Sequence, residues 1–218
     1  MQLSSGRGTP PVVLNLIIIN VIVYLLTNIL WPNLIVYFEL FYPIPNAPAA
    51  PFRFEPYQLV TYMFGHGGFW HIAFNMFALW MFGSQIEMVW GGKKFLLFYL
   101  ACGLGAAGFN FLVNYLKLQG GEAVLSEMGP MLGASGAIFG ILAAFGMLFP
   151  NQMLMMLFPP IPMKAKYFVL LYAGLELFSG ISANPGDNVA HFAHLGGGLT
   201  GLIMLLYWKS RGELWKQG

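Results

Sequence analysis

Six long apolar stretches constrain what this chain can fold into. A membrane-spanning helix needs about 20 mostly apolar residues. Stretches of about this length lie at residues 12–31, 69–89, 95–116, 131–149, 167–183 and 189–208. Only helices and closed barrels satisfy the backbone inside a bilayer, and these stretches lack the alternation of barrel strands. The sequence therefore predicts an all-α polytopic membrane bundle with six transmembrane helices, forming one domain over residues 1–218.

The composition excludes several other classes of protein. Apolar residues make up 58% of the 218 residues and charged residues 8%, whereas soluble domains carry about 25% charged residues. A net charge of +2 gives no strong attraction for polyanions, so we expect no nucleic-acid partner. Cys102 is the only cysteine, which rules out a disulfide within the chain. The expected partner is the lipid bilayer.

The basic residues predict the orientation in the membrane. With six spans both termini lie on one side, and cytoplasmic segments of membrane proteins carry an excess of Lys and Arg. The segments on the side of the termini hold eight such residues: Arg7, Lys93, Lys94, Lys164, Lys166, Lys209, Arg211 and Lys216. The opposite segments hold only Arg53 and Lys117. We expect a multi-pass protein of the inner cell membrane with both termini in the cytoplasm.

The first outer loop, residues 33–68, is rich in aromatic residues and prolines. The prolines disfavour a spanning helix, and aromatic rings favour the headgroup region of a bilayer. We therefore expect this loop to be partly embedded at the membrane surface.

Polar residues at membrane depth are costly and are the first candidates for function. His71 and Asn75 lie one helical turn apart in span two, Ser135 lies in span four and His194 in span six. All three spans run inward from the outer side. At about 1.5 Å per residue, the four side chains lie roughly 5–10 Å below the outer boundary. The sequence predicts that they share one depth.

Glycines in spans four and six predict that these helices pack closely. Each span carries a pair of glycines four positions apart, a spacing that lets helix backbones approach. The pairs are Gly136 with Gly140 and Gly197 with Gly201. Close contact would bring the Ser135 hydroxyl within reach of the His194 imidazole, and a hydroxyl beside a base is an activated nucleophile. His71, Asn75 and the Ser135 backbone N–H are then candidate donors to an oxyanion.

Each of these residues also has an ordinary structural interpretation. Ser135 is suited to helix packing, and Asn75 to clamping two helices together. His66 and His191, at the membrane boundary, are better explained as structural or water-organising groups. Glu87 and Glu176 are expected to be buried hydrogen-bonding partners. The functional interpretation depends on shared depth and glycine spacing together.

Three motifs resemble those of the rhomboid family of intramembrane serine proteases. Residues 66–77 (HGGFWHIAFNMF) resemble the family's span-two signature. Residues 133–136 (GASG) are similar to its GxSG motif, and residues 193–201 (AHLGGGLTG) to its AHxxGxxxG motif. The motifs occur in the family's order on the expected spans. One departure is residues 55–58 (EPYQ), where many members have a Trp-Arg pair before span two.

The resemblance implies a role for each matching residue. Ser135 would be the nucleophile and His194 the base, in a dyad without an aspartate. His71, Asn75 and the Ser135 amide would form the oxyanion hole, supported by His66, Gly133, Gly136, Gly197 and Gly201. Phe139 would pack against His194. The implied activity is hydrolysis, without a cofactor, of transmembrane or membrane-anchored protein substrates near the outer leaflet.

Three alternatives remain open from the sequence. A catalytically silent rhomboid relative would bind membrane clients without cleaving them, although such proteins typically lack the serine or the histidine. The four histidines could form a zinc site, but the H-E-x-x-H spacing of metalloproteases is absent and no acidic residue lies at that depth on the same helices. A transporter is disfavoured because nothing resembles paired broken helices.

Overall fold

The computed structural model describes residues 8–43, 52–121, 129–155, 160–182 and 190–218. Each predicted span overlaps a helical segment. The first is α1 (Pro11–Leu25) with a π-helical turn, Leu26–Leu30. The second runs through α3 (Phe69–Ala78), a π-helical turn (Leu79–Gly83) and α4 (Ser84–Trp90). The others are α5 (Gly92–Gly120), α6 (Ser135–Leu148), α7 (Ala165–Ser182) and α8 (His191–Ser210).

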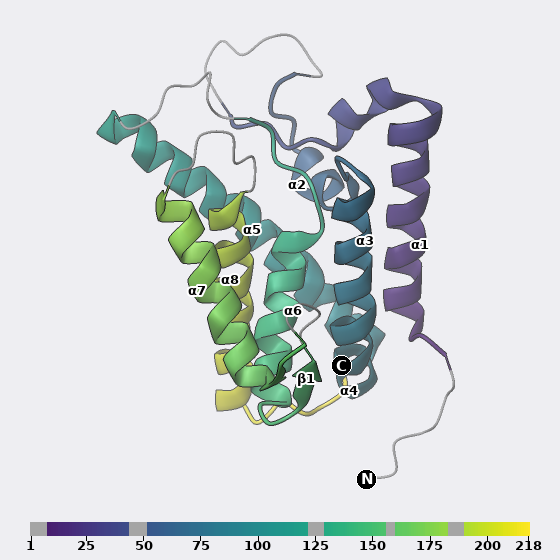
Figure 1. The fold of residues 1–218 in the computed structure, drawn as a ribbon, viewed down its shortest axis with the longest axis vertical. Helices are drawn as coiled ribbons and strands as arrows, with labels where there is room; N and C mark the ends of the chain where they lie inside the picture. Colours follow the sequence, from purple (N-terminus) through teal and green to yellow (C-terminus); the bar gives the residue numbers. More distant parts are fainter. Residues whose placement is uncertain (1–7, 44–51, 122–128, 156–159, 183–189) are drawn as a thin grey trace.

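Short elements connect these helices. The part of the first outer loop that is described contains a 3-10 helix (Pro32–Phe38), the single turn α2 (Gln58–Thr61) and a second 3-10 turn (Tyr62–Phe64). Strands β1 (Met153–Met155) and β2 (Pro162–Lys164) pair antiparallel between α6 and α7. Figure 1 shows that α1 begins, and α8 ends, at the end of the bundle where this hairpin lies.

The fold is an all-α polytopic membrane bundle, as the sequence predicts. Among the described residues, three helical segments are long and apolar enough to cross a membrane: Pro11–Leu30, Phe69–Trp90 and Gly92–Gly120. The number of six spans stays a prediction. The shorter α6 lies in the middle of the bundle, beside α3, α5 and α8 (Figure 1).

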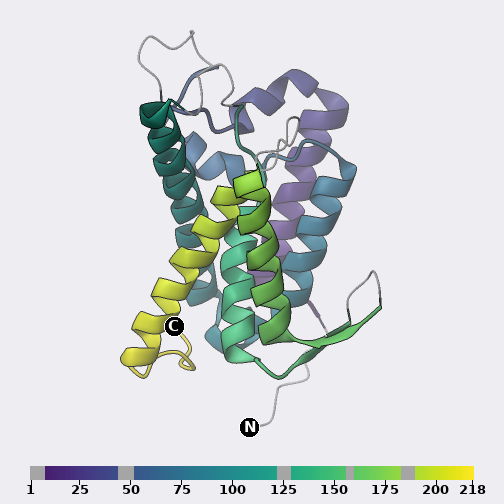
Figure 2. The same cartoon turned by 60° about the vertical axis from the view of Figure 1, so that its left-hand side comes forward.

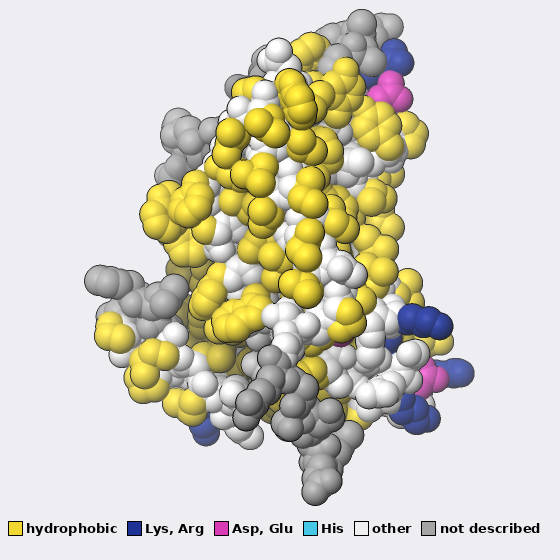
Figure 3. Space-filling model, turned by 90° about the vertical axis from the view of Figure 1, so that its right-hand side faces the viewer, with side chains coloured by type: hydrophobic (Ala, Val, Ile, Leu, Met, Phe, Trp, Pro, Cys, Tyr) yellow, Lys and Arg dark blue, Asp and Glu magenta, His cyan; other side chains and the backbone are white. Residues whose placement is uncertain are grey.

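The surface of the bundle is apolar where lipid would contact it. Along α1, large side chains at helical spacing are exposed, among them Leu14 (43%), Ile18 (45%) and Ile22 (50%). Figure 3 shows apolar side chains over the middle of this face, with Lys, Arg and acidic groups towards its two ends. Such a large exposed apolar surface would be unfavourable in water, but in a bilayer it can face the lipid.

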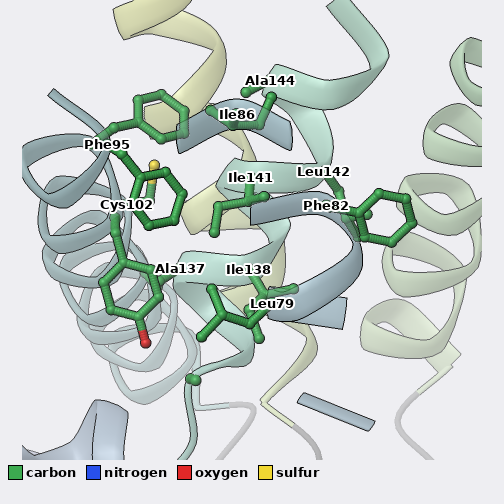
Figure 4. Close-up of a cluster of buried hydrophobic side chains, with 14 of the residues drawn as sticks. Leu79, Phe82, Ile86, Phe95, Cys102, Ala137, Ile138, Ile141, Leu142 and Ala144 are labelled. Atoms are coloured by element: carbon green, nitrogen blue, oxygen red, sulfur yellow. The ribbon is translucent and has the colours of Figure 1, made fainter. Parts of the chain in front are cut away.

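The interior is packed around α6. Ile138, Ile141 and Leu142 of α6 lie with Leu79 and Phe82 of the second span in one buried cluster (Figure 4). The chain's only cysteine, Cys102, is also fully buried there.

A buried carboxylate joins the inner end of the second span to α1. Glu87 accepts hydrogen bonds from the backbone N–H groups of Val12 (2.9 Å) and Val13 (2.7 Å). Glu87 thereby satisfies two of the N–H groups that the first turn of α1 leaves free. The expectation that Glu87 is a buried hydrogen-bonding partner is confirmed.

Glycines allow the α6 and α8 backbones to touch. A Cβ atom on Gly197 would overlap the backbone carbonyl oxygen of Gly136, and one on Gly201 would lie 2.9 Å from the Cα atom of Gly140. We call these four residues the glycine contact. It is the close approach that their spacing predicts.

We expect Gly197→Ala to destabilise the bundle by about 1–3 kcal/mol or more, because the added methyl group forces α6 and α8 apart. Gly198→Ala is the matched control, since its Cβ would meet only the Phe139 carbonyl oxygen at 3.9 Å. Reversible unfolding in mixed micelles measures the free energy of unfolding of each variant. Equal stabilities of the two variants would contradict backbone packing at residue 197.

Candidate active site

Ser135 is the first residue of α6, not a residue inside it. The predicted span begins at residue 131, which is wrong for the helix, because residues 131–134 are not helical. Met131 and Leu40 exchange backbone hydrogen bonds of 3.0 and 2.8 Å, and the Gly133 N–H donates to the Tyr62 carbonyl oxygen at 2.8 Å. The first outer loop thus holds the approach to α6 in place. Ser135 consequently lies among the free N–H groups of a helix N-terminus, where negative charge is favoured.

The Ser135 hydroxyl and the His194 imidazole are in contact. Ser135 Oγ lies 2.7 Å from His194 Nε2, within hydrogen-bonding distance. Both side chains are half-buried. They come from α6 and α8, and the glycine contact that joins these helices brings the two groups together. This is the pairing by which a base can activate a hydroxyl nucleophile.

Phe139 fixes one face of the His194 ring. The two rings are stacked with centroids 4.6 Å apart and planes inclined by 5°. Phe139 lies one turn after Ser135 on α6, so a single helix carries both the hydroxyl and the ring that orients its partner. Phe139 also meets Tyr172 of α7, at 5.9 Å between centroids.

Gly133 keeps a space open between His71 and Ser135. Its φ of +122° is a conformation that side chains rarely adopt. A Cβ atom there would lie 2.7 Å from His71 Nε2 and 3.7 Å from Ser135 Oγ. His71 Nε2 and the Ser135 hydroxyl therefore both lie close to the position that a side chain on residue 133 would occupy.

Asn75 is buried one turn beyond His71 on α3. Its side-chain Nδ2 donates a hydrogen bond of 2.8 Å to the His71 backbone carbonyl oxygen. An amide group has two N–H donors, so this bond leaves one for a ligand. Within the described residues no hydrogen bond joins the Asn75 side chain to Ser135. The structure thus brings Ser135, His194, Phe139 and His71 together, with Asn75 adjacent on α3.

His66 has a structural setting. Its side chain is fully buried, its ring meets that of His71 edge-on at 4.9 Å, and its Nδ1 lies 3.3 Å from the Phe64 carbonyl oxygen. Its own carbonyl oxygen accepts a hydrogen bond from Asn28 Nδ2 at 3.0 Å. Burial, aided by the neighbouring His71, lowers the pKa of His66 to about 4. The His66 ring thus packs against the edge or face of the His71 ring within the protein interior.

Glu176 lies in the site, although the sequence did not predict it there. It was expected only to be a buried hydrogen-bonding partner: the hydrogen bonding is confirmed, but the burial is only partial, since the side chain is 14% exposed. Its Oε2 lies 2.9 Å from Nδ1 of His194 and 2.7 Å from Nδ1 of His191. Counting back from the outer end of the fifth span would have given its depth, though not its contact with His194. Residue 176 lies seven residues from the predicted end at 183, about 10 Å deep and level with Ser135.

The same three residues have the donor atoms of a metal site. Glu176, His191 and His194 each offer one ligand atom, and these atoms lie within 4.8 Å of one another. Two imidazoles and a carboxylate suit zinc. The sequence shows no acidic residue at this depth on the histidines' own helices, but α7 supplies one. In the structure the Glu176 carboxylate contacts both imidazoles.

We expect Gly133→Ala to slow the reaction of Ser135 with a serine-directed fluorophosphonate by about 10²- to 10³-fold, the range for loss of one oxyanion donor. The methyl group would displace His71, and the strained backbone adds about 1–3 kcal/mol of destabilisation. Gly129→Ala is the control, because nothing lies within 4 Å of its Cβ position. Equal labelling rates for the two variants would mean that the space beside Gly133 is not part of the site.

His66 should make the bundle less stable in mild acid. Its folded-state pKa of about 4 lies below the ordinary value of 6.5, so the unfolded chain takes up the proton first. The stability contributed by neutral His66 is complete above pH 6.5 and is lost as the pH falls towards 4, by about 3 kcal/mol. Comparing the free energies of unfolding of wild type and His66→Phe between pH 4 and pH 7 isolates this contribution. Parallel pH dependences would contradict it.

Comparisons with known proteins agree with the motifs. The model of the Rhomboid domain matches residues 53–211. The chain is 33% identical to human presenilin-associated rhomboid-like protein, mitochondrial, over 99% of this chain and 53% of that protein. It is 34% identical to Rhomboid protein 1, mitochondrial, of Saccharomyces cerevisiae, over 67% of this chain and 40% of that protein.

A bacterial relative matches over a shorter stretch. The Rhomboid protease GluP of Bacillus subtilis is 38% identical over 90 residues, 41% of this chain and 15% of that protein. The chain spans about half the length, or less, of these curated relatives. A family match over residues 53–211, on a membrane helical bundle with paired serine and histidine, assigns this chain to the rhomboid family.

Proposed function

We propose that the chain is an intramembrane serine endopeptidase that hydrolyses peptide bonds of membrane-anchored protein substrates near the outer leaflet. The observation that carries the proposal is the 2.7 Å contact between Ser135 Oγ and His194 Nε2. Membership of the rhomboid family and the protease named among the relatives support the same activity. The proposed enzyme is a single membrane domain and needs no cofactor.

Acylation begins at Ser135. His194 Nε2 takes the hydroxyl proton as Oγ attacks the carbonyl carbon of the scissile bond, which gives a tetrahedral intermediate with a negatively charged oxygen. The C–N bond then breaks, and His194 returns the proton to the leaving amine. The acyl group stays on Ser135 as an ester.

The negative oxygen would be stabilised by groups around Gly133. The Ser135 N–H at the start of α6, the His71 imidazole and the second N–H of Asn75 are the proposed donors. Asn75 would have to turn its amide towards the intermediate, because its observed bond is to its own helix. Hydrolysis of the ester repeats the chemistry, with water in place of the substrate as nucleophile and His194 as base.

The substrate must be locally unwound to react. The backbone of a transmembrane helix is already paired internally and offers no free carbonyl group. Residues that weaken a helix should therefore mark the cleaved bond. Access beside α7 is the proposed route, since Ala165 is the only residue of α7 that is buried in the bundle, and Figure 2 shows α7 on the outside next to α8.

The unequal distribution of basic residues supports an orientation with both termini in the cytoplasm and the active site towards the outer side. The proposed location is the inner cell membrane. Two relatives are named as mitochondrial. Cell fractionation would distinguish a cell-membrane location from a mitochondrial one.

The first test is labelling with a fluorophosphonate in detergent. We expect wild type to label, Ser135→Ala to give no label, and His194→Ala to label at least about 10³-fold more slowly. Ser84→Ala is a matched control, because Ser84 is another serine at the start of a helix, and its buried hydroxyl has no hydrogen-bond partner among the described residues. Labelling that survives Ser135→Ala would refute the assignment of the nucleophile.

The second test separates a protease from a client-binding relative. Reconstituted wild type is incubated with a membrane-anchored reporter that carries Gly and Ala residues near the outer end of its helix. Cleavage that Ser135→Ala abolishes supports the proposal. Stable binding of the reporter by wild type, without cleavage or labelling, would favour the silent client-binding function.

A further inference from the structure

We propose that Glu176 is a positioning residue that completes a Ser135–His194–Glu176 triad. The inference rests on the proposed function and goes beyond the serine–histidine dyad that the family motifs imply. Its basis is that the two nitrogens of one imidazole contact the two partners such a triad requires. His194 Nε2 meets Ser135 Oγ at 2.7 Å, and His194 Nδ1 meets Glu176 Oε2 at 2.9 Å.

The carboxylate selects which nitrogen of His194 carries the proton. A neutral imidazole has one N–H donor and one acceptor nitrogen, whereas an ionised carboxylate can only accept. The contact with Glu176 therefore places the hydrogen on Nδ1. This leaves a lone pair on Nε2, the nitrogen that faces Ser135, and only that tautomer can take the hydroxyl proton.

The carboxylate is itself held in place. His191 Nδ1 also meets Oε2, at 2.7 Å, so two imidazoles converge on one oxygen. Hydrogen bonds from two donors stabilise its negative charge. His191 and His194 lie one turn apart on α8 and Glu176 on α7, so the arrangement bridges these neighbouring helices (Figure 2).

The ring of His194 is restrained from two directions. Phe139 covers one face, and Glu176 contacts the edge opposite the nucleophile. When His194 takes the Ser135 proton it becomes a cation beside the carboxylate, and their attraction stabilises the charge that develops during acylation. The His194 and Glu176 side chains are 13% and 14% exposed, so water screens this attraction only in part.

A purely structural role for Glu176 makes a different prediction. Since α7 buries only Ala165, the bonds from Glu176 to α8 could serve simply to tether α7. Loss of a tether would lower stability and disturb substrate binding. Loss of a positioning group would lower kcat and the labelling rate of Ser135, while KM and the melting temperature change little.

The test compares Glu176→Gln with Glu87→Gln in the full chain. Glu87 is the matched control, because it is a buried carboxylate in the same bundle that also accepts two hydrogen bonds, both from the backbone of α1. For Glu176→Gln we expect kcat and the fluorophosphonate labelling rate of the folded protein to fall together by about 10²-fold. This fall is smaller than the roughly 10⁴-fold loss of kcat that follows when the carboxylate of a Ser-His-Asp triad is replaced by an amide. KM should stay within about threefold of the wild-type value.

The control should behave in the opposite way. Glu87→Gln is expected to lower the melting temperature and leave the labelling rate of the folded protein unchanged. Glu176→Asp, which keeps the charge, should recover part of the lost rate, and it replaces Glu176→Gln as the decisive variant if the latter does not fold. Labelling of the wild type should be unaffected by EDTA.

Several results would overturn the inference. Labelling of Glu176→Gln at the wild-type rate would leave the dyad and the proposed function intact but remove the triad. The triad is also refuted if Glu176→Asp loses as much rate as Glu176→Gln, or if EDTA abolishes wild-type labelling, which would make the three residues a metal site. A wild-type chain that neither labels nor cleaves would overturn the proposed function and the triad with it.

Discussion

The contact between the backbones of α6 and α8 determines the geometry of the site. Gly136 and Gly197 lie where any side chain on residue 197 would separate the helices. The serine directly precedes Gly136 and the histidine lies three residues before Gly197, so the separation of the two backbones sets the 2.7 Å distance between the reacting groups. Phe139, which is on α6, orients the His194 ring only while this contact holds.

A bilayer offers no water to polar groups at depth, and several polar groups of the bundle are satisfied by other groups of the protein. Glu87 binds the first turn of α1, and Glu176 binds two imidazoles on α8. On α1, Thr27 bonds back to the carbonyl oxygen of Val23. These side chains differ in what surrounds them: Glu87 contacts backbone and serves the fold, whereas Glu176 contacts the imidazole that faces Ser135. The groups that each carboxylate contacts, rather than its residue type, distinguish the structural role of Glu87 from the role proposed for Glu176.

Local patterns in the sequence predict most of the fold and part of the site. Apolar runs locate the helices, and glycine spacing predicts the approach of α6 to α8, because both are properties of a single helix. The start of α6 at Ser135 could not be predicted in this way, since it depends on pairing between Met131 and Leu40, some 90 residues apart. The position of Glu176 depends likewise on how α7 lies against α8. The sequence placed His66 at the membrane boundary but did not indicate that its side chain is fully buried.

The proposed nucleophile, Ser135, and its proposed base, His194, belong to different helices and lie 59 residues apart in the chain. A bifunctional inhibitor that first acylates Ser135 and then alkylates His194 would therefore do more than block the site. It would form a covalent staple between α6 and α8 and close a long loop, which reduces the entropy of the unfolded chain as a disulfide does. Such a complex should resist unfolding by detergent far better than one in which only Ser135 is modified.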